Sequence, residues 1–135
     1  MKIWYGYGSE HSMNLVMIGS FKDTNDAYET KKVIEKITVQ AEVDRDNKLY
    51  DVGNASDRYS DDMLTTLMNA RINTVSTAEL EQFFYDVSVE SKANQIIIKT
   101  DEIDISAFLK ILLEKGAKVE VYSAHDYPKE EQSLD

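Results

Sequence analysis

The chain has 135 residues, of which 25 are Asp or Glu and 15 are Lys or Arg, so its formal net charge is −10. This length, with 42% hydrophobic residues, fits one soluble globular domain. The negative charge disfavours binding to nucleic-acid phosphates and to anionic membrane surfaces, which both attract clustered Lys and Arg. The absence of cysteine excludes a disulfide framework, a thiol nucleophile and an iron–sulfur cluster.

The first ten residues lack the pattern of a secretory signal. Such a signal needs about 7–15 consecutive apolar residues, whereas Gly6, Gly8 and Glu10 interrupt this segment. We therefore expect a cytoplasmic location. We also expect residues 1–128 to form a single α/β domain, because Pro128 ends the periodic pattern, and residues 129–135 to form a polar C-terminal tail.

Two segments near the N-terminus are rich in aromatic and apolar residues. They are Lys2–Tyr7 and Asn14–Phe21, and a short polar connector joins them. This pattern predicts two strands in an antiparallel hairpin. Because both segments carry apolar residues on both faces, we expect them inside a sheet.

The next segment has the spacing of a helix from about Thr24 to Val43, with Asp23 as a candidate N-cap. Asn, Ser and Gly then predict a long loop over Lys48–Tyr59. A short strand at Leu49–Val52 is an alternative for part of this loop.

Two further helices are predicted before the C-terminal third. Ser60 is the candidate N-cap of the first. Ser76 and Glu79 fit a capping box at the start of the second, which continues to Val87 at helical spacing. Only four or five residues separate these helices, so they are expected to form an αα-hairpin.

The C-terminal third has the pattern of a β-α-β unit. Ile96–Ile98 forms a buried strand core, Asp104 is a candidate helix cap, and Gly116 ends the helix. Strand alternation resumes over Ala117–Ser123. The two strands of such a unit are parallel and joined by a right-handed crossover.

The predicted order is β-β-α-α-α-β-α-β. This order indicates an α/β protein, an α+β sandwich, with a mixed sheet of about four strands and helices packed on it. A ferredoxin-like arrangement with a helical insertion is the alternative description.

The two histidines, His11 and His125, each lie next to a carboxylate, Glu10 and Asp126 respectively. If the strands that precede them are neighbours, these groups converge and form a divalent metal site or an acid–base catalytic site. Solvated loop histidines are the simpler interpretation. The sequence contains no nucleotide-binding or nucleophile motif, so we predict no cofactor and favour a non-enzymatic role.

Several tyrosines lie near predicted segment ends or on polar faces: Tyr50, Tyr59, Tyr122 and Tyr127. Exposed aromatic residues among acidic ones favour contacts with protein rather than with nucleic acid. Packing of the rings in the core is the alternative. A homodimer would also explain part of the aromatic excess.

The opening sequence KIWYGYGSEHSMNLVMIGSF, followed by KDTNDA and a helix, resembles the start of a family of small bacterial proteins of unknown function. The resemblance covers about the first 40 residues. It implies a bacterial or phage-related origin and a small stand-alone domain, and it carries no activity, cofactor or site residue.

These observations lead to three functional hypotheses. The first is a protein-interaction module, an accessory, inhibitor or immunity-type partner of a basic protein, since opposite charges speed encounter. The second is a small metal-dependent or acid–base enzyme that uses the histidine and carboxylate loops. The third is a small-molecule sensor with an apolar pocket between sheet and helices.

Overall fold

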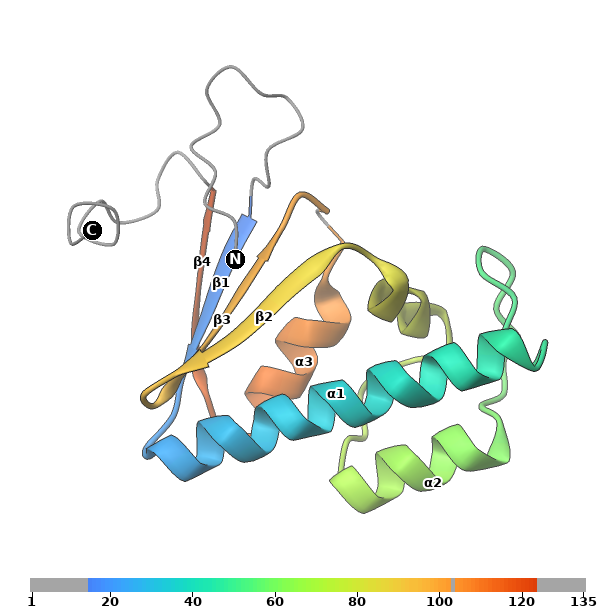
Figure 1. Cartoon of the computed structure of the whole chain (residues 1–135), viewed down its shortest axis with the longest axis horizontal. Coiled ribbons are helices and arrows are strands. Elements are labelled where there is room, and N and C mark those ends of the chain that lie inside the picture. The colour runs from blue at the N-terminus through green and yellow to red at the C-terminus, as the bar shows by residue number, and fades with distance from the viewer. Residues whose placement is uncertain (1–14, 103, 124–135) are drawn as a thin grey trace.

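The structure is a computed structural model that describes residues 15–102 and 104–123 (Figure 1). The described part contains four strands, three α-helices and one 3₁₀ helix, η1. In chain order they are β1 (Leu15–Ser20), α1 (Thr24–Asp46), α2 (Asp61–Ala70), η1 (Ala78–Phe84), β2 (Val87–Lys92), β3 (Gln95–Thr100), α3 (Ser106–Glu114) and β4 (Lys118–Ser123).

The strands form one sheet in the order β2-β3-β1-β4, with every neighbouring pair antiparallel. Met17 of β1 lies opposite Ile98 of β3 on one side and Val121 of β4 on the other. With α2 and η1 set aside, the elements follow the β-α-β-β-α-β order of ferredoxin-like folds. The predicted α+β class is therefore confirmed, and the strand order fits the ferredoxin-like description with a helical insertion.

The sheet is antiparallel rather than mixed. β3 and β4 run in the same direction, as the predicted β-α-β unit requires, but β1 lies between them and is antiparallel to both. β1 is paired along its full length on both sides, so it has no free edge for a hairpin partner. The predicted strand Lys2–Tyr7 and the tail 129–135 lie outside the described residues.

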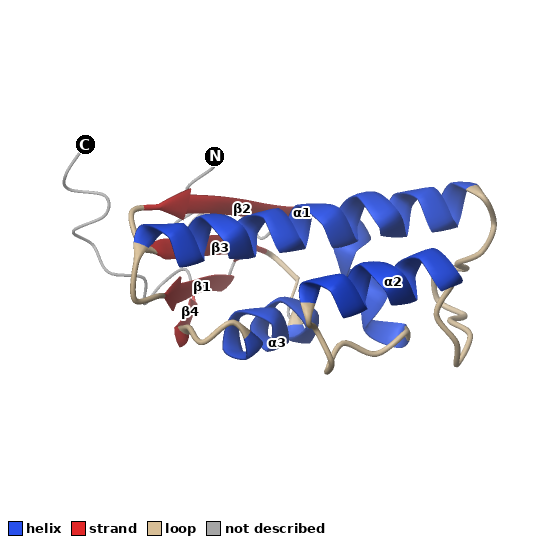
Figure 2. Cartoon of the chain, turned by 90° about the horizontal axis from the view of Figure 1, so that it is seen from below, coloured by secondary structure: helices blue, strands red, loops and turns tan. Residues whose placement is uncertain are grey.

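The helices α1 and α3 cover one face of the sheet, and α1 extends beyond it to pack on α2 and η1 (Figure 2). Met17, Ile96 and Ile98 point from the sheet into this main core. On the opposite face, Val16, Ile18 and Ile97 form a smaller buried cluster, against which Tyr122 packs. One part of the main core therefore lies between the sheet and the helices α1 and α3, and another part lies between α1, α2 and η1.

The predicted starts of α1 and α2 are confirmed. The carboxylate of Asp23 accepts a hydrogen bond from the Asp26 N–H at 2.9 Å, and the Ser60 hydroxyl accepts one from the Met63 N–H at 3.0 Å. The α1 helix continues to Asp46, three residues beyond its predicted end. No helix within the described residues has the length and apolarity needed to span a membrane.

The predicted third helix is a 3₁₀ helix that ends at Phe84, so Val87 belongs to β2 and not to a helix. The predicted capping box is present. The Ser76 N–H donates to the Glu79 carboxylate at 2.8 Å, and the Glu79 N–H donates to the Ser76 hydroxyl at 3.2 Å. The predicted loop at 48–59 is confirmed, and the alternative short strand at 49–52 does not form.

The start of α3 is capped by another element and not by Asp104. Ile105 occupies the N-cap position and offers no side-chain acceptor. Instead, the side-chain oxygen of buried Gln82 accepts a hydrogen bond from the Ala107 N–H at 2.7 Å. The Gln82 amide donates to Asp104 at 3.1 Å and to Ser106 at 3.0 Å. This amide therefore ties η1 to the first turn of α3.

Candidate functional site

The residues of the predicted metal or acid–base site, Glu10, His11, His125 and Asp126, lie outside the described residues, as does Tyr127. Their convergence stays a prediction. Within 15–102 and 104–123, no group of three or more His, Cys, Asp or Glu side chains is arranged to hold a metal ion.

The other predicted contact tyrosines are described. Tyr50 is half-buried, lies 5.9 Å from Phe84 between ring centroids, and donates its hydroxyl to the Thr77 carbonyl at 2.9 Å. Tyr59 is also half-buried and donates to the Val75 carbonyl. Both rings pack against the main core, so they fasten one segment of the chain to another. Tyr122 packs against the smaller apolar cluster on the opposite face of the sheet.

Tyr50 and Tyr59 both belong to the loop 47–60, which runs from the end of α1 at Asp46 to the start of α2 at Asp61. Loops longer than about 12–15 residues without secondary structure are uncommon in compact domains and are usually functional or disordered. This one carries several hydrogen bonds to the rest of the chain, as an ordered loop does.

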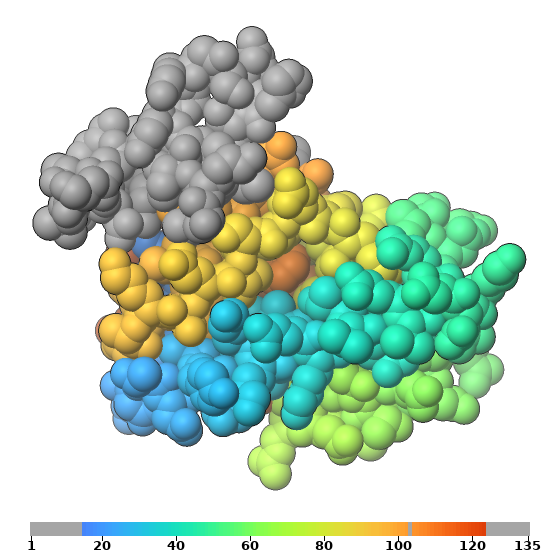
Figure 3. All heavy atoms as spheres, viewed as in Figure 1, coloured from blue at the N-terminus to red at the C-terminus, as the bar shows by residue number. Residues whose placement is uncertain are grey.

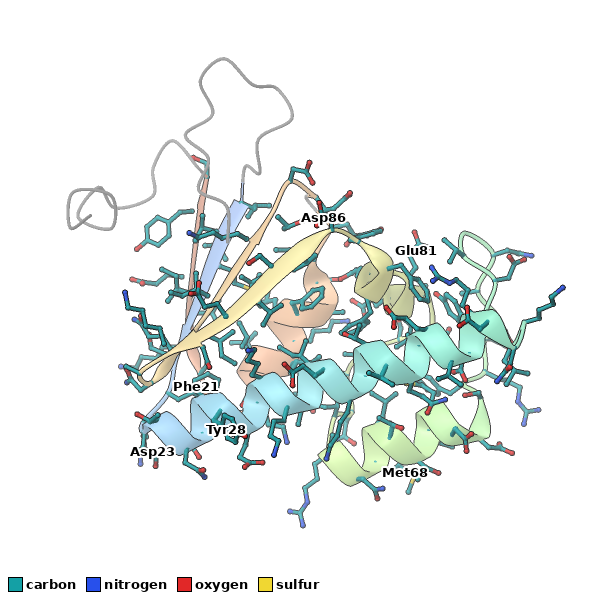
Figure 4. The ribbon with its side chains drawn as sticks, in the orientation of Figure 1. Phe21, Asp23, Tyr28, Met68, Glu81 and Asp86 are labelled. Carbon is teal, nitrogen blue, oxygen red and sulfur yellow. The ribbon has the colours of Figure 1, made fainter. Side chains whose placement is uncertain are left out.

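Several hydrogen bonds hold this loop in place. Besides the two from the tyrosine hydroxyls, the Gly53 N–H donates to the Glu81 carboxylate at 3.1 Å, and the Leu49 N–H donates to the Asp44 carbonyl at 2.7 Å. The Leu49 bond closes the chain directly after α1, while the other three reach η1 or the turn before it. Glu81 lies on the η1 side that faces this loop (Figure 4).

The hydroxyl of Tyr50 donates its hydrogen bond throughout the neutral pH range. Burial and the nearby Glu81 carboxylate raise the pKa of Tyr50 above its ordinary value of 10.0. The phenol therefore stays protonated at neutral pH, and its bond to the Thr77 carbonyl does not depend on pH there.

The loop and the helix ends next to it expose both apolar and acidic side chains. Leu49 is 61% exposed and Val52 is 47% exposed. Five exposed carboxylates surround them in the sequence, and two exposed cations, Lys48 and Arg58, accompany them. We call the apolar and acidic members of this segment the acidic loop surface; it consists of Leu49, Val52, Asp46, Asp51, Asp57, Asp61 and Asp62.

A second feature is the carboxylate of Glu79, whose side chain is only 14% exposed. Burial alone would raise its pKa, but hydrogen bonds from Ser106, Ser76 and Lys110 outweigh burial and lower the pKa to about 2. The Ser106 hydroxyl donates at 2.6 Å and the Lys110 ammonium at 2.9 Å. A carboxylate with so low a pKa is a weak base, so this cluster fits a structural clamp between η1 and α3 better than acid–base catalysis.

Glu114 of α3 has a similar role at the other end of that helix. Its carboxylate accepts hydrogen bonds from the Asn73 N–H at 2.9 Å and from the Thr74 hydroxyl at 2.7 Å. Burial opposes ionisation, but these hydrogen bonds prevail and lower the pKa of Glu114. The turn after α2 is thereby held against α3.

Two hollows on the described part are large enough to be considered as sites. A groove of about 820 Å³ runs between α1 and α2, and a smaller cavity of about 270 Å³ lies between α1, η1 and β2. The groove carries charges of both signs, including Lys36 and Arg71 beside Glu29 and Glu35. The cavity is lined by apolar and aromatic residues together with Thr38, Glu42 and Arg45. Both arise from contacts between distant segments, so no local sequence signal could have located them.

The fold and these features define a small α+β domain with ferredoxin-like strand order, a helical insertion and an ordered acidic loop. The chain belongs to the family described as "Family of unknown function (DUF6375)", whose model matches residues 1–134. The similarity to a family of unknown function therefore extends well beyond the first 40 residues. No curated protein and no solved structure matches the chain.

Proposed function

We propose that the protein is a non-enzymatic module that binds a basic protein through the acidic loop surface, as an accessory, inhibitor or immunity-type partner. One observation carries this proposal. Leu49 and Val52 are exposed on a loop that long-range hydrogen bonds hold in place, and five exposed carboxylates lie within the segment 46–62.

The fixed loop supports binding because ordering a flexible segment on association costs free energy. An immobilised long side chain costs about 0.5–1.5 kcal/mol on binding, and a preordered backbone reduces such losses. The hydroxyls of Tyr50 and Tyr59 supply that order in the free protein.

The residue types on this surface have separate roles in the proposal. Leu49 and Val52 provide the apolar contacts that are buried on docking. The carboxylates around them, such as Asp51 and Asp57, attract a basic partner and repel an acidic one. This arrangement favours a partner that presents Lys and Arg around an apolar patch.

The experiment compares immobilised wild-type protein with the variant Leu49→Ser/Val52→Ser and the variant Asp51→Lys/Asp57→Lys in a lysate of the native host. Retained proteins are identified by mass spectrometry, purified and titrated against each variant. Leu113→Ser is the matched apolar control because Leu113 is 54% exposed on α3. Glu120→Lys is the matched charge control because Glu120 is exposed on β4.

The proposal predicts that the wild type and both controls retain the same basic protein, and that both loop variants bind it at least about tenfold more weakly. Equal retention by the loop variants would contradict the proposal. Retention of acidic proteins only, or of no protein, would also contradict it. If instead a second copy of the chain occupies the surface, the wild type dimerises in sedimentation experiments and the loop variants do not, and the basic-partner proposal is then wrong.

A second candidate function, a small-molecule sensor, is favoured by the cavity between α1, η1 and β2. None of the residues that line this cavity belongs to the acidic loop surface. Variants of the two sites therefore test the two candidate functions separately.

A further inference from the structure

The helix α1 carries apolar side chains on the side that faces away from the core as well as on its buried side. Successive residues of an α-helix are about 100° apart, so Val39 lies almost opposite the buried residues Ile37 and Ala41. Val39 is 59% exposed, and Val43, one turn further along, is 42% exposed. Figure 3 shows the atoms of α1, coloured blue to teal, along the front surface of the molecule. Polar residues are the usual occupants of this side of a surface helix.

An exposed charged residue lies beyond each end of this apolar pair. Lys36 lies three residues before Val39, and Asp46 lies three residues after Val43. The spacing i, i+3, i+7, i+10 places the four residues in one line along the helix. We call this set the α1 stripe; it consists of Lys36, Val39, Val43 and Asp46. At a rise of about 1.5 Å per residue, the two charged residues are about 15 Å apart along α1, so they do not pair with each other.

The α1 stripe is complementary to itself when two copies of α1 run antiparallel. In such a pair, Val39 of one copy can lie opposite Val43 of the other. A step of three residues outward from this contact, in opposite directions on the two helices, brings Lys36 opposite Asp46 in the same register. A twofold axis then repeats each contact. Asp46 is the last residue of α1, where the helix dipole disfavours a carboxylate, so a lysine from a second copy is favourable there.

The two charges of the α1 stripe also favour a second copy over a partner of one charge sign. A basic partner is repelled by Lys36, and an acidic partner is repelled by Asp46. Neither residue is a member of the ion pairs found within the described residues. Lys36 and Val39 also line the groove between α1 and α2, so a helix that docks on the stripe covers one edge of this groove.

We propose that the α1 stripe is the interface of a homodimer in which the two α1 helices pack antiparallel. Val39 of each copy packs on Val43 of the other, and Lys36 of each copy pairs with Asp46 of the other. A contact between helices about three turns long buries less than the roughly 1,200 Å² of standard interfaces, so the dimer is weak and reversible. The interface shares Asp46 with the acidic loop surface but contains neither Leu49 nor Val52.

The test is sedimentation equilibrium of the full chain from about 10 µM to about 1 mM, at about 150 mM salt. The wild type is expected to form dimers in the upper part of this range. Val39→Ser/Val43→Ser should dimerise at least about tenfold more weakly. This variant should fold, because Ser and Val have similar helix propensities. The control is Leu113→Ser, which replaces an exposed apolar residue of α3 and should dimerise like the wild type.

Charge reversal tests the register of the two helices. Lys36→Asp and Asp46→Lys each place like charges opposite each other, so each should weaken the dimer at least about tenfold. The double variant Lys36→Asp/Asp46→Lys restores opposite charges at both contacts and should dimerise about as strongly as the wild type. Because the two positions are about 15 Å apart within one chain, this rescue reports a contact between copies. Lys92→Asp, at the exposed end of β2, is the charge control.

The outcomes test the dimer, its face and its register separately. A chain that stays monomeric at about 1 mM would overturn the homodimer. Dimerisation that Val39→Ser/Val43→Ser leaves unchanged would overturn the assignment to the α1 stripe. A double charge variant as weak as the single variants would overturn the antiparallel register. Leu49→Ser/Val52→Ser should dimerise like the wild type; if it abolishes the dimer, the second copy occupies the acidic loop surface, and both this proposal and the basic-partner proposal are wrong.

Discussion

Replacing Glu79 with Gln is expected to destabilise the fold most strongly at neutral pH. Gln keeps the size of the side chain but loses the charge that pairs with Lys110 at 2.9 Å and accepts the Ser106 hydroxyl at 2.6 Å. Both partners lie on α3, whereas Glu79 lies on η1. The substitution therefore weakens the clamp between these two elements.

The magnitude follows from the pKa of Glu79, which lies at about 2 in the folded protein against an ordinary value of 4.5. Such a difference corresponds to about 3 kcal/mol of stability in favour of the ionised folded state, and to about 2 kcal/mol after allowance for solvent screening. Because the folded pKa is lowered, this contribution is fully present above pH 4.5 and is lost as the pH falls toward 2. At pH 3 less than half of it remains.

The assay is urea denaturation of the wild type and of Glu79→Gln at pH 7 and at pH 3. The difference in unfolding free energy should be about 2 kcal/mol at pH 7 and about 1 kcal/mol or less at pH 3. Glu35→Gln is the control, since its partner Lys31 lies 3.8 Å away on the surface and such a pair is worth about 0.3–0.5 kcal/mol. A Glu79→Gln effect that is equal at the two pH values would refute the linkage argument.

Three further substitutions test the packing and capping described above by thermal or urea denaturation. Ser60→Ala removes the cap of α2 and a 2.7 Å hydrogen bond to buried Asp44, and should cost about 1–2 kcal/mol; a variant as stable as the wild type would show that neither bond matters. Gly19→Val should cost about 1–3 kcal/mol, because a Cβ atom there lies 3.1 Å from the Leu112 side chain, and an unchanged melting temperature would contradict this contact. Gly116→Ala should cost about 1 kcal/mol because the backbone φ is +89°, and a stabilised variant would show that this conformation is not required.

Local rules predicted the helix starts well because their determinants lie within three residues of one another. The expected hydrogen bonds all form: the side chains of Asp23 and Ser60 each accept one from a backbone N–H three residues later, and Ser76 and Glu79 cap each other. The cap of α3 was missed because its acceptor is Gln82, 25 residues away in the sequence. A local rule contains no information about such a partner.

The β2 strand was missed because its sequence fits two patterns. Val87 continues the helical spacing of Leu80 and Phe84, but Val87 and Val89 also alternate with polar residues as in a strand. Pairing with β3 across the turn at Ala93 and Asn94 settles the choice, since Val89 lies opposite Ile98. Sheet pairing is a tertiary contact that outweighs local preference.

The candidate sites show the same division between local and distant information. The loop over 48–59 was predicted from its composition, but its order depends on Thr77, Val75 and Glu81, which lie 16 to 28 residues away. The cavity at Arg45 depends on four elements and left no sequence signal. The predicted site at His11 and His125 lies outside the described residues.

The most direct test of the proposed function is the dissociation constant of the retained basic protein for wild type and for Leu49→Ser/Val52→Ser at about 150 mM salt. These side chains are exposed, so their replacement should change the free energy of unfolding by no more than about 0.5 kcal/mol. The proposal predicts at least about tenfold weaker binding by this variant, with Leu113→Ser unchanged. Equal dissociation constants for wild type and the loop variant would contradict it.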